Sequence, residues 1–447
     1  MATRQDRGMV RGTIGAILLL TIALLVSFWA FVLSPRSLLV DQDHPWIDEG
    51  YGATSRPIGN DLTGLFLPRF LWQSQIWQVH GLIPGWDSRG FCGRPNVGNP
   101  QAGVWYPPVW FAWSWGEPSA LGWLTVIHLL WAGVGASTLG RMFGLGIGSA
   151  TVTGAIVMIN PYVIAQVYEG HLPHVWSASW YPWVFVGALW LRRGSPLGWL
   201  ILPPSLALAL MTGHPQEGVY LVLVLVGWFT IDSIKVLRSH RMISKNTSAP
   251  SSLIRSRAIM RSFVAFILVA GISSVEWIPV LLCRPWAVGP LGGAMGSGSG
   301  PYHLDPSNLL QLISPRALGG AHDYIGRGNQ WETMLSTGWC PLILVVLGMA
   351  AYPDRVVVRG WSLVLGLSLW YAAGPALGLA KIINALPGLN AVRVPARSLF
   401  LSELAASVLA GMGTEIIARG VDRRRAVRWL GWYGGVVGLL ALMLGVG

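Results

Sequence analysis

The segment Gly12-Thr-Ile-Gly-Ala-Ile-Leu-Leu-Leu-Thr-Ile-Ala-Leu-Leu-Val-Ser-Phe-Trp-Ala-Phe-Val-Leu33 carries no charged side chain, and Arg4, Arg7 and Arg11 precede it. About 20 apolar residues in a helix cross the hydrocarbon layer of a bilayer, so this segment is long enough to span a membrane. Because Lys and Arg gather on the cytoplasmic side, the three arginines predict a cytoplasmic N-terminus. A cleaved signal peptide is the alternative, but its apolar run is usually about 7–15 residues and ends at a small-residue cleavage site, which is missing here.

The whole chain shares this apolar character. Of its 447 residues 53% are hydrophobic and 11% are charged, against about 25% charged in an ordinary soluble domain. Such a chain cannot cover its surface with charge, which excludes a soluble enzyme. The net charge of +12 would suggest nucleic acid in a soluble protein, but here membrane topology accounts for the basic residues.

Apolar segments of spanning or nearly spanning length recur along the chain. With the first, they predict an all-α polytopic membrane protein of about eleven transmembrane helices. When the segments alternate between sides, most Lys and Arg fall on the cytoplasmic side and most Asp and Glu on the other. The further segments are 119–140, 147–167, 174–191, 197–212, 217–237, 262–283, 336–352, 358–380, 397–418 and 429–446.

This alternation also predicts unequal loops. Both of the longest loops, 34–118 and 284–335, lie on the extracytoplasmic side. Because functional residues are concentrated on loops, we expect the chemistry on that side. Cys92, Cys283 and Cys340 show no metal-like spacing and receive no role. The predicted parts are the cytoplasmic N-terminus and first helix (1–33), a first extracytoplasmic loop (34–118), transmembrane helices (119–237), a basic cytoplasmic loop (238–261), a transmembrane helix (262–283), a second extracytoplasmic loop (284–335) and C-terminal transmembrane helices (336–447).

Asp61 is the first candidate for a functional carboxylate, because it begins an apolar segment of the first outer loop. Asp is also a preferred helix N-cap, a role worth about 1 kcal/mol, and residue type alone favours that reading. Asp48 with Glu49, or Asp87, could pair with Asp61 around Mg²⁺ or Mn²⁺, since both ions favour carboxylate oxygens. The spacing of these acids does not specify a metal.

Two turns on the same predicted face contain Gly-His pairs, in Glu169-Gly-His-Leu-Pro-His174 and Gly213-His-Pro-Gln-Glu217. Plain hairpin turns are one reading, because Gly and Pro punctuate turns. In the other reading, His171 and His214 hydrogen-bond a sugar or a phosphate. A zinc site of His171, His174 and His214 is a further alternative, although their spacing matches no helical zinc motif.

Arg393 and Arg397 lead into a late apolar segment at positions i and i+4, which places them on one side near the headgroups. Arginine suits bidentate phosphate contact, and snorkelling to lipid headgroups is the alternative. Two arginines on the outer face run against the usual excess of Lys and Arg on the cytoplasmic side. This favours a functional role, such as phosphate binding, over snorkelling. Glu332 reads as a helix cap or a substrate contact, and Glu276 and Glu403 as intramembrane carboxylates.

An ordered set of short segments over roughly residues 10–415 resembles the YfhO-like family of bacterial membrane proteins, within the GT-C superfamily of polytopic glycosyltransferases. Each segment is weak alone, and their common order carries the resemblance. They are Asn60-Asp61 with Phe66-Leu-Pro68, Gly81-Leu-Ile-Pro-Gly-Trp86 with Gly93-Arg-Pro95, Tyr106-Pro107, Gly170-His171, Gly213-His-Pro-Gln216, the turn from Leu335 to Pro341, and Leu386-Pro-Gly388 with Arg393-Val-Pro-Ala-Arg397.

The resemblance implies a GT-C-like bundle in the bacterial inner membrane, with a long first extracytoplasmic loop that carries a functional carboxylate and an active site that faces the extracytoplasmic side. It implies transfer of a sugar from a polyprenyl-phosphate donor to an extracytoplasmic glycan, lipid or protein. Asp61 matches the first-loop acid, and Arg393 and Arg397 match the late arginine motif. The chain departs from the family in its length, in having no sizeable C-terminal outer domain, and in having Asp87 where an amide is more usual, which puts acceptor recognition in question.

A mechanism follows as a hypothesis. Asp61 acts as general base on an acceptor hydroxyl, and Arg393 and Arg397 stabilise the departing lipid phosphate, so one direct displacement inverts the anomeric centre. His171, His214, Asp87 and Glu332 are further candidate substrate contacts. A lipid-linked sugar transporter or flippase is the second class of function, and Glu276 and Glu403 fit it best. A non-catalytic membrane partner in envelope assembly is the third.

Overall fold

The computed structural model describes residues 4–33, 61–90, 92–243, 250–286, 302–320, 323–352, 355–386, 389, 392, 394–420 and 431. Within these residues the chain is mostly helical, and its sheet is a small antiparallel hairpin of β1 (Trp86–Asp87) and β2 (Arg94–Pro95). Asp48, Glu49, Arg393 and the predicted segment 429–446, apart from residue 431, lie outside the described residues.

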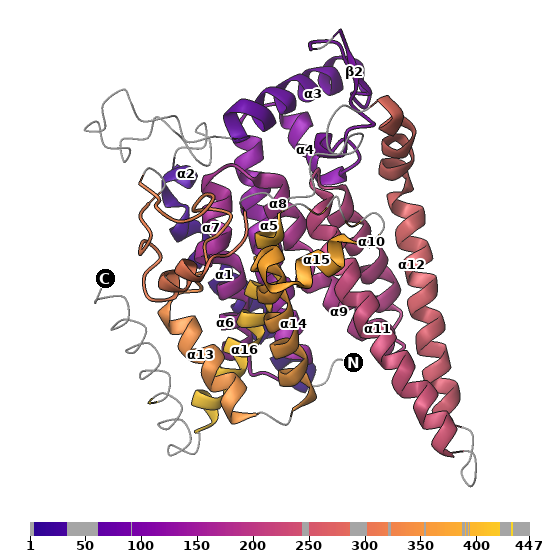
Figure 1. Cartoon of the computed structure of the whole chain (residues 1–447), viewed down its shortest axis with the longest axis vertical. Coiled ribbons are helices and arrows are strands. Elements are labelled where there is room, and N and C mark those ends of the chain that lie inside the picture. The colour runs from indigo at the N-terminus through magenta and orange to yellow at the C-terminus, as the bar shows by residue number, and fades with distance from the viewer. Residues whose placement is uncertain are drawn as a thin grey trace.

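A bundle of long helices makes up the body, and α3, α4 and the hairpin form a smaller layer at one end, which we call the α3 end (Figure 1). The elements are α1 (Arg4–Ser27), α2 (Trp29–Leu33), η1 (Leu62–Phe66), α3 (Leu67–His80), η2 (Pro100–Ala102), α4 (Pro107–Trp115), α5 (Ser119–Met142), α6 (Ile147–Ile159), α7 (Pro161–Tyr168), α8 (Leu172–Ser179), α9 (Tyr181–Arg192), α10 (Leu197–Met211), α11 (Pro215–Ile243), α12 (Pro250–Cys283), η3 (Arg284–Trp286), η4 (Pro306–Leu312), α13 (Trp339–Ala351), α14 (Val356–Ala372), η5 (Gly374–Leu377), α15 (Leu379–Asn384), η7 (Pro395–Ser398) and α16 (Leu399–Arg419).

Four helical segments among the described residues are long and apolar enough to cross a membrane: Ser119–Met142, Ile147–Tyr168, Ile259–Trp286 and Pro395–Arg419. Shorter apolar helices cover Ile14–Ser27, Leu197–Met211, Trp339–Ala350 and Val356–Ala372. The all-α class and the membrane character therefore agree with the sequence, whereas the prediction of about eleven spans finds support at only these four.

Local breaks divide two of the predicted segments into shorter helices. The segment 147–167 is interrupted at Asn160, whose side chain accepts a hydrogen bond from Val163 N and so starts a new helix at Pro161. The segment 174–191 is divided at Trp180 between α8 and α9, with Pro182 near the start of the second helix. The Ile147–Tyr168 segment still counts among the four despite its break, whereas α8 and α9, with 8 and 12 residues, are each too short to span.

The helix α16 forms the centre of the bundle and α12 its flank (Figure 1). The Pro395–Arg419 segment is 89% buried, whereas the Ile259–Trp286 segment is 22% buried. Close packing around α16 depends on glycine: a Cβ at Gly413 would lie 2.8 Å from the Leu344 carbonyl carbon in α13, and one at Gly411 would overlap Thr153 in α6. Small residues let helices approach in this way inside membranes.

The α3-end layer is held to the bundle through the turn at residues 99–103. Arg69 Nη1 and Gln73 Nε2 in α3 donate to the carbonyl oxygens of Gln101 and Ala102, at 2.6 and 3.1 Å. A Cβ at Gly103 would lie 3.2 Å from the Thr212 carbonyl oxygen, and one at Gly213 would lie 3.4 Å from that of Gln101. Both glycines have positive φ, so this close contact between the layer and the α10–α11 turn requires them.

Candidate functional site

Asp61 lies directly before the π-helical turn η1 and makes no capping hydrogen bond with its side chain. Instead, its Oδ2 lies 3.1 Å from His171 Nε2, and 49% of the side chain is exposed. Gly170 allows this contact, because its φ is +80° and a Cβ there would lie 2.7 Å from Leu62 N. The hydrogen bond to His171 lowers the pKa of Asp61, and the positive charge of Arg397 acts in the same direction. The geometry therefore presents Asp61 as a carboxylate and not as a helix cap.

Gln166 fixes how His171 meets Asp61. The buried amide of Gln166 donates from Nε2 to the Trp331 carbonyl oxygen at 2.8 Å, so its Oε1 accepts from His171 Nδ1 at 2.7 Å. Nδ1 therefore carries a proton. A hydrogen bond between Nε2 and Asp61 Oδ2 then needs one proton on either atom, and the Asp61–His171 pair holds that proton between them. Asp61 Oδ1 has no hydrogen-bond partner among the described residues, and about half of the Asp61 side chain is exposed.

Glu217 joins two further histidines. Its Oε1 accepts from His174 Nδ1 at 2.8 Å and its Oε2 from His214 Nδ1 at 2.5 Å, and the Glu217 side chain is fully buried. The rings stack in sequence: the centres of His171 and His174 are 4.9 Å apart, and those of His174 and His214 are 3.6 Å apart. The three imidazoles thus form a continuous stack that begins at Asp61.

Arg397 closes the other end of the stack. Its Nη1 donates to His214 Nε2 at 2.9 Å, and its Nε and Nη2 donate to Glu332 Oε1 at 2.9 and 2.5 Å. His214 is therefore neutral, with its proton on Nδ1, and burial lowers its pKa accordingly. Arginine has five N–H groups, so with three used here, two of Arg397 are left without a partner among the described residues.

Five of the candidate site residues thus meet in one cluster: Asp61, His171, His214, Arg397 and Glu332. Asp87 does not join them. It lies in the β1–β2 hairpin, where Arg89 and Arg94 approach its carboxylate at 3.0 and 3.3 Å and Arg89 lowers its pKa to about 2. These ion pairs give Asp87 a role in holding the hairpin.

The cluster does not suit a zinc ion in this geometry. His174, His214 and Glu217 place one ligand atom each within 4.8 Å of one another. Tetrahedral Zn–N bonds of about 2 Å diverge and hold two imidazole centres roughly 5 Å apart, whereas these centres lie 3.6 Å apart with an angle of 23° between the planes. The short contacts are those of a hydrogen-bonded His–Glu–His unit. The predicted Mg²⁺ or Mn²⁺ site depends on Asp48 or Glu49, which lie outside the described residues.

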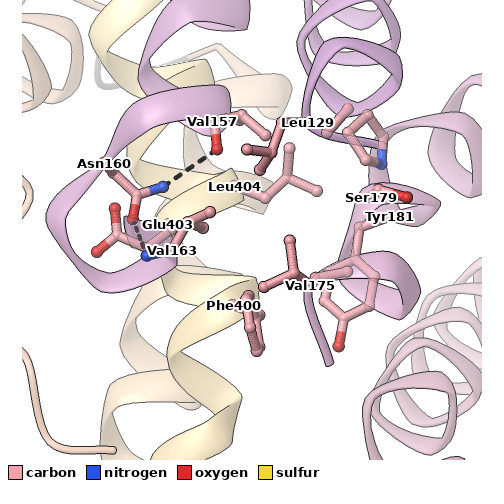
Figure 2. A pocket seen from close by; sticks show the side chains of 13 residues that line it. Leu129, Val157, Asn160, Val163, Val175, Ser179, Tyr181, Phe400, Glu403 and Leu404 are labelled. Carbon is pink, nitrogen blue, oxygen red and sulfur yellow. Dashed lines mark hydrogen bonds between the residues drawn. The ribbon is translucent and has the colours of Figure 1, made fainter. Parts of the chain in front are cut away.

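Glu403 lies apart from the cluster. It lines a cavity of about 20 Å³ between α16, α6 and α8 together with Asn160, Val175 and Tyr181, and its Oε2 has no partner among the described residues (Figure 2). Such a volume holds a single water molecule. Glu276 in α12 is also buried, and neither of its carboxylate oxygens has a partner in the described part of the chain.

Sequence reasoning gave no role to Gln166 or Glu217, which connect the cluster. Glu217 stands three residues after His214, a spacing that places both at one helix start, and this signal was available. Gln166 lies within an apolar segment, where periodicity assigns it to the core. Comparison of the chain with protein-family models, curated proteins and solved structures gave no match.

Proposed function

We propose that the chain is an integral-membrane glycosyltransferase that moves a sugar from a polyprenyl-phosphate donor to a hydroxyl acceptor, with the α3 end facing the extracytoplasmic side of a bacterial inner membrane. The observation that carries the proposal is the juxtaposition of Asp61 and Arg397 at the two ends of one histidine stack. A general base and a phosphate-binding cation are the two groups that this reaction needs.

Each group has a defined part. The acceptor hydroxyl gives its proton to Asp61 as its oxygen attacks the anomeric carbon, and the bond from that carbon to the phosphate oxygen breaks. The bonding electrons leave with the lipid phosphate, whose charge meets the two N–H groups of Arg397 that have no partner among the described residues. One displacement of this kind inverts the anomeric centre. Glu332 and His214 hold the guanidinium in place, and His171 holds Asp61.

The test is a transfer assay on purified protein in detergent with a panel of polyprenyl-phosphate sugars. Loss of a general base lowers a rate by roughly 10²- to 10⁴-fold, so we expect a fall of that size in Asp61→Asn. Glu415→Gln is the matched control: this carboxylate pairs with Arg419 at the other end of α16. Wild-type turnover in Asp61→Asn would reject the catalytic role and favour a non-catalytic assembly partner.

Arg397 needs a charge-balanced variant, because removing it alone leaves buried Glu332 without its partner and destabilises the fold. The double variant Arg397→Gln with Glu332→Gln avoids this. We expect it to fold and to lose transfer, whereas Glu332→Gln alone retains the cation and part of the rate. Full transfer by the double variant would show that the phosphate binds elsewhere.

Transport of a lipid-linked sugar is the second candidate, because Glu276 and Glu403 are buried inside spanning segments without partners among the described residues. Reconstituted vesicles with a fluorescent polyprenyl-phosphate sugar separate the two functions. A transporter moves the lipid between leaflets, depends on Glu276 or Glu403, and is indifferent to Asp61→Asn.

A further inference from the structure

Two buried polar atoms beside the cluster have no hydrogen-bond partner among the described residues: the hydroxyl of Tyr162 and Oε2 of Glu169. Tyr162 is fully buried and Glu169 is 3% exposed. A buried polar group left unpaired costs about 1–3 kcal/mol, so such groups in a folded protein call for an explanation, such as a water, an ion or a ligand.

Both residues belong to one polar stripe on α7. Positions 162, 166 and 169 follow the i, i+4, i+7 spacing of a single helix face, with Glu169 directly after the last helical residue. The direction of this face is known from its middle member, since Gln166 bonds His171 and the Trp331 carbonyl. The stripe therefore faces the cluster.

The two ends of the stripe lie at the two ends of the cluster. The ring of Tyr162 packs edge-on against Phe400, with centres 4.9 Å apart, and Phe400 stands three residues after Arg397. The charges of Glu332 and Arg397 act on the Tyr162 hydroxyl. At the other end, the charge of Asp61 acts on Glu169, which is separated from His171 only by Gly170. Two helical turns, roughly 10 Å, separate Tyr162 from Glu169.

We infer that Tyr162 and Glu169 form a subsite for sugar hydroxyl groups, between a phosphate at Arg397 and an acceptor at Asp61. The inference rests on the proposed function and deepens it. A tyrosine hydroxyl donates and accepts, and a carboxyl group does the same when protonated, so each of the two can bind a different sugar hydroxyl as donor or as acceptor. The neighbouring guanidinium matches the phosphate to which such a sugar is joined.

Tyr162→Phe tests the subsite because it removes the hydroxyl alone. In the protein without ligand this hydroxyl has no partner within the described part of the chain, so we expect its removal to leave the melting temperature unchanged or to raise it. In the presence of donor the same change loses a hydrogen bond, and we expect kcat/KM to fall roughly 10- to 100-fold. A residue with a purely structural role gives the opposite pattern.

Tyr106→Phe is the matched control with that opposite pattern. The Tyr106 hydroxyl bonds His128 and accepts from Trp180 Nε1 at 2.8 Å, outside the cluster. We expect this variant to melt at a lower temperature and to keep the wild-type kcat/KM. Wild-type kinetics in Tyr162→Phe would overturn the subsite and leave a bound water as the explanation of the unpaired hydroxyl.

Binding measurements separate this inference from the proposed reaction. The melting temperature of Asp61→Asn is recorded with and without each polyprenyl-phosphate sugar, and then with Tyr162→Phe added. A ligand-induced rise that the second substitution abolishes supports the subsite, even when the wild type shows no turnover and the transfer reaction fails. A rise that survives Tyr162→Phe overturns the subsite alone. No rise and no turnover with any sugar overturn both.

Discussion

At the scale of single residues, the cluster is defined by where its protons lie. Arg397 donates to one nitrogen of His214, and Gln166 accepts from one nitrogen of His171. These contacts make His214 neutral and direct the second nitrogen of His171 at Asp61. When both ring nitrogens of a buried histidine have hydrogen-bond partners, the orientation of the ring is fixed. The histidine stack therefore connects Asp61 to Arg397 through contacts of fixed geometry.

Glu169 makes the stability of the folded chain depend on pH. Burial raises the pKa of its carboxyl to about 8, and the charge of Asp61 adds to the effect. Between its ordinary value of 4.5 and about 8, the folded chain holds a proton that the unfolded chain releases, so the free energy of unfolding falls as pH rises through this range. Glutamine does not titrate, so Glu169→Gln removes this fall in the free energy of unfolding.

We therefore expect the stability of Glu169→Gln relative to wild type to increase from pH 5 to pH 8, on the order of 1–3 kcal/mol, measured as thermal unfolding in detergent. Glu117→Gln is the control, because the Glu117 side chain is exposed, and its difference from wild type should not change with pH. An advantage of Glu169→Gln that is constant across this range would contradict the assignment.

At the scale of elements, the meeting of Asp61 with His171 depends on one glycine. Gly170→Ala forces a left-handed conformation on alanine, which costs roughly 1–2 kcal/mol, and also drives a Cβ into Leu62. Gly144→Ala has the same strain without the collision, since φ is +86° there and nothing lies within 4 Å of its Cβ.

We expect Gly170→Ala to lose more stability than Gly144→Ala and, unlike it, to lose most of its transfer activity, because Asp61 is displaced from His171. Thermal unfolding and the transfer assay on both variants measure this. Equal losses in both would mean that the close approach of residues 62 and 170 does not position the base.

The sequence predicted much of this cluster and little of its connections. Asp61, His171, His214 and Arg397 were candidates from residue type and predicted side alone, and they do lie together. Asp87 was a similar candidate, but its carboxylate is neutralised by Arg89, two residues away, and by Arg94, its partner in the hairpin register. Gln166 lies in an apolar segment, where the pattern predicts a buried core position and gives no sign of a functional role for a single amide. The role of Gln166 depends on its contacts with His171 and with the distant Trp331 carbonyl, and a single sequence does not show these contacts.

At the scale of the whole molecule, the bundle depends on backbone contact around α16. Gly413→Ala places a methyl group within 2.8 Å of the Leu344 carbonyl carbon, which two packed helices relieve only by separating. We expect a loss of about 1–3 kcal/mol, measured as a lower melting temperature in detergent.

Gly366→Ala is the matched control on α14. Its Cβ would meet nothing within 4 Å, so the change gains up to about 1 kcal/mol from the higher helix propensity of alanine. Equal melting temperatures of the two variants would show that α13 and α16 are not closely packed at this level.

The contact of Gly103 with the turn before His214 has a mechanical consequence. The α3-end layer and the His214 turn meet in direct backbone contact, since even a Cβ on Gly103 would lie 3.2 Å from the Thr212 carbonyl oxygen. We expect a tilt of the layer to shift the backbone from Thr212 to His214. Such a shift would also move the guanidinium of Arg397, which donates a hydrogen bond to His214. The orientation of the α3-end layer and the position of the Arg397 guanidinium are therefore connected through one short stretch of backbone.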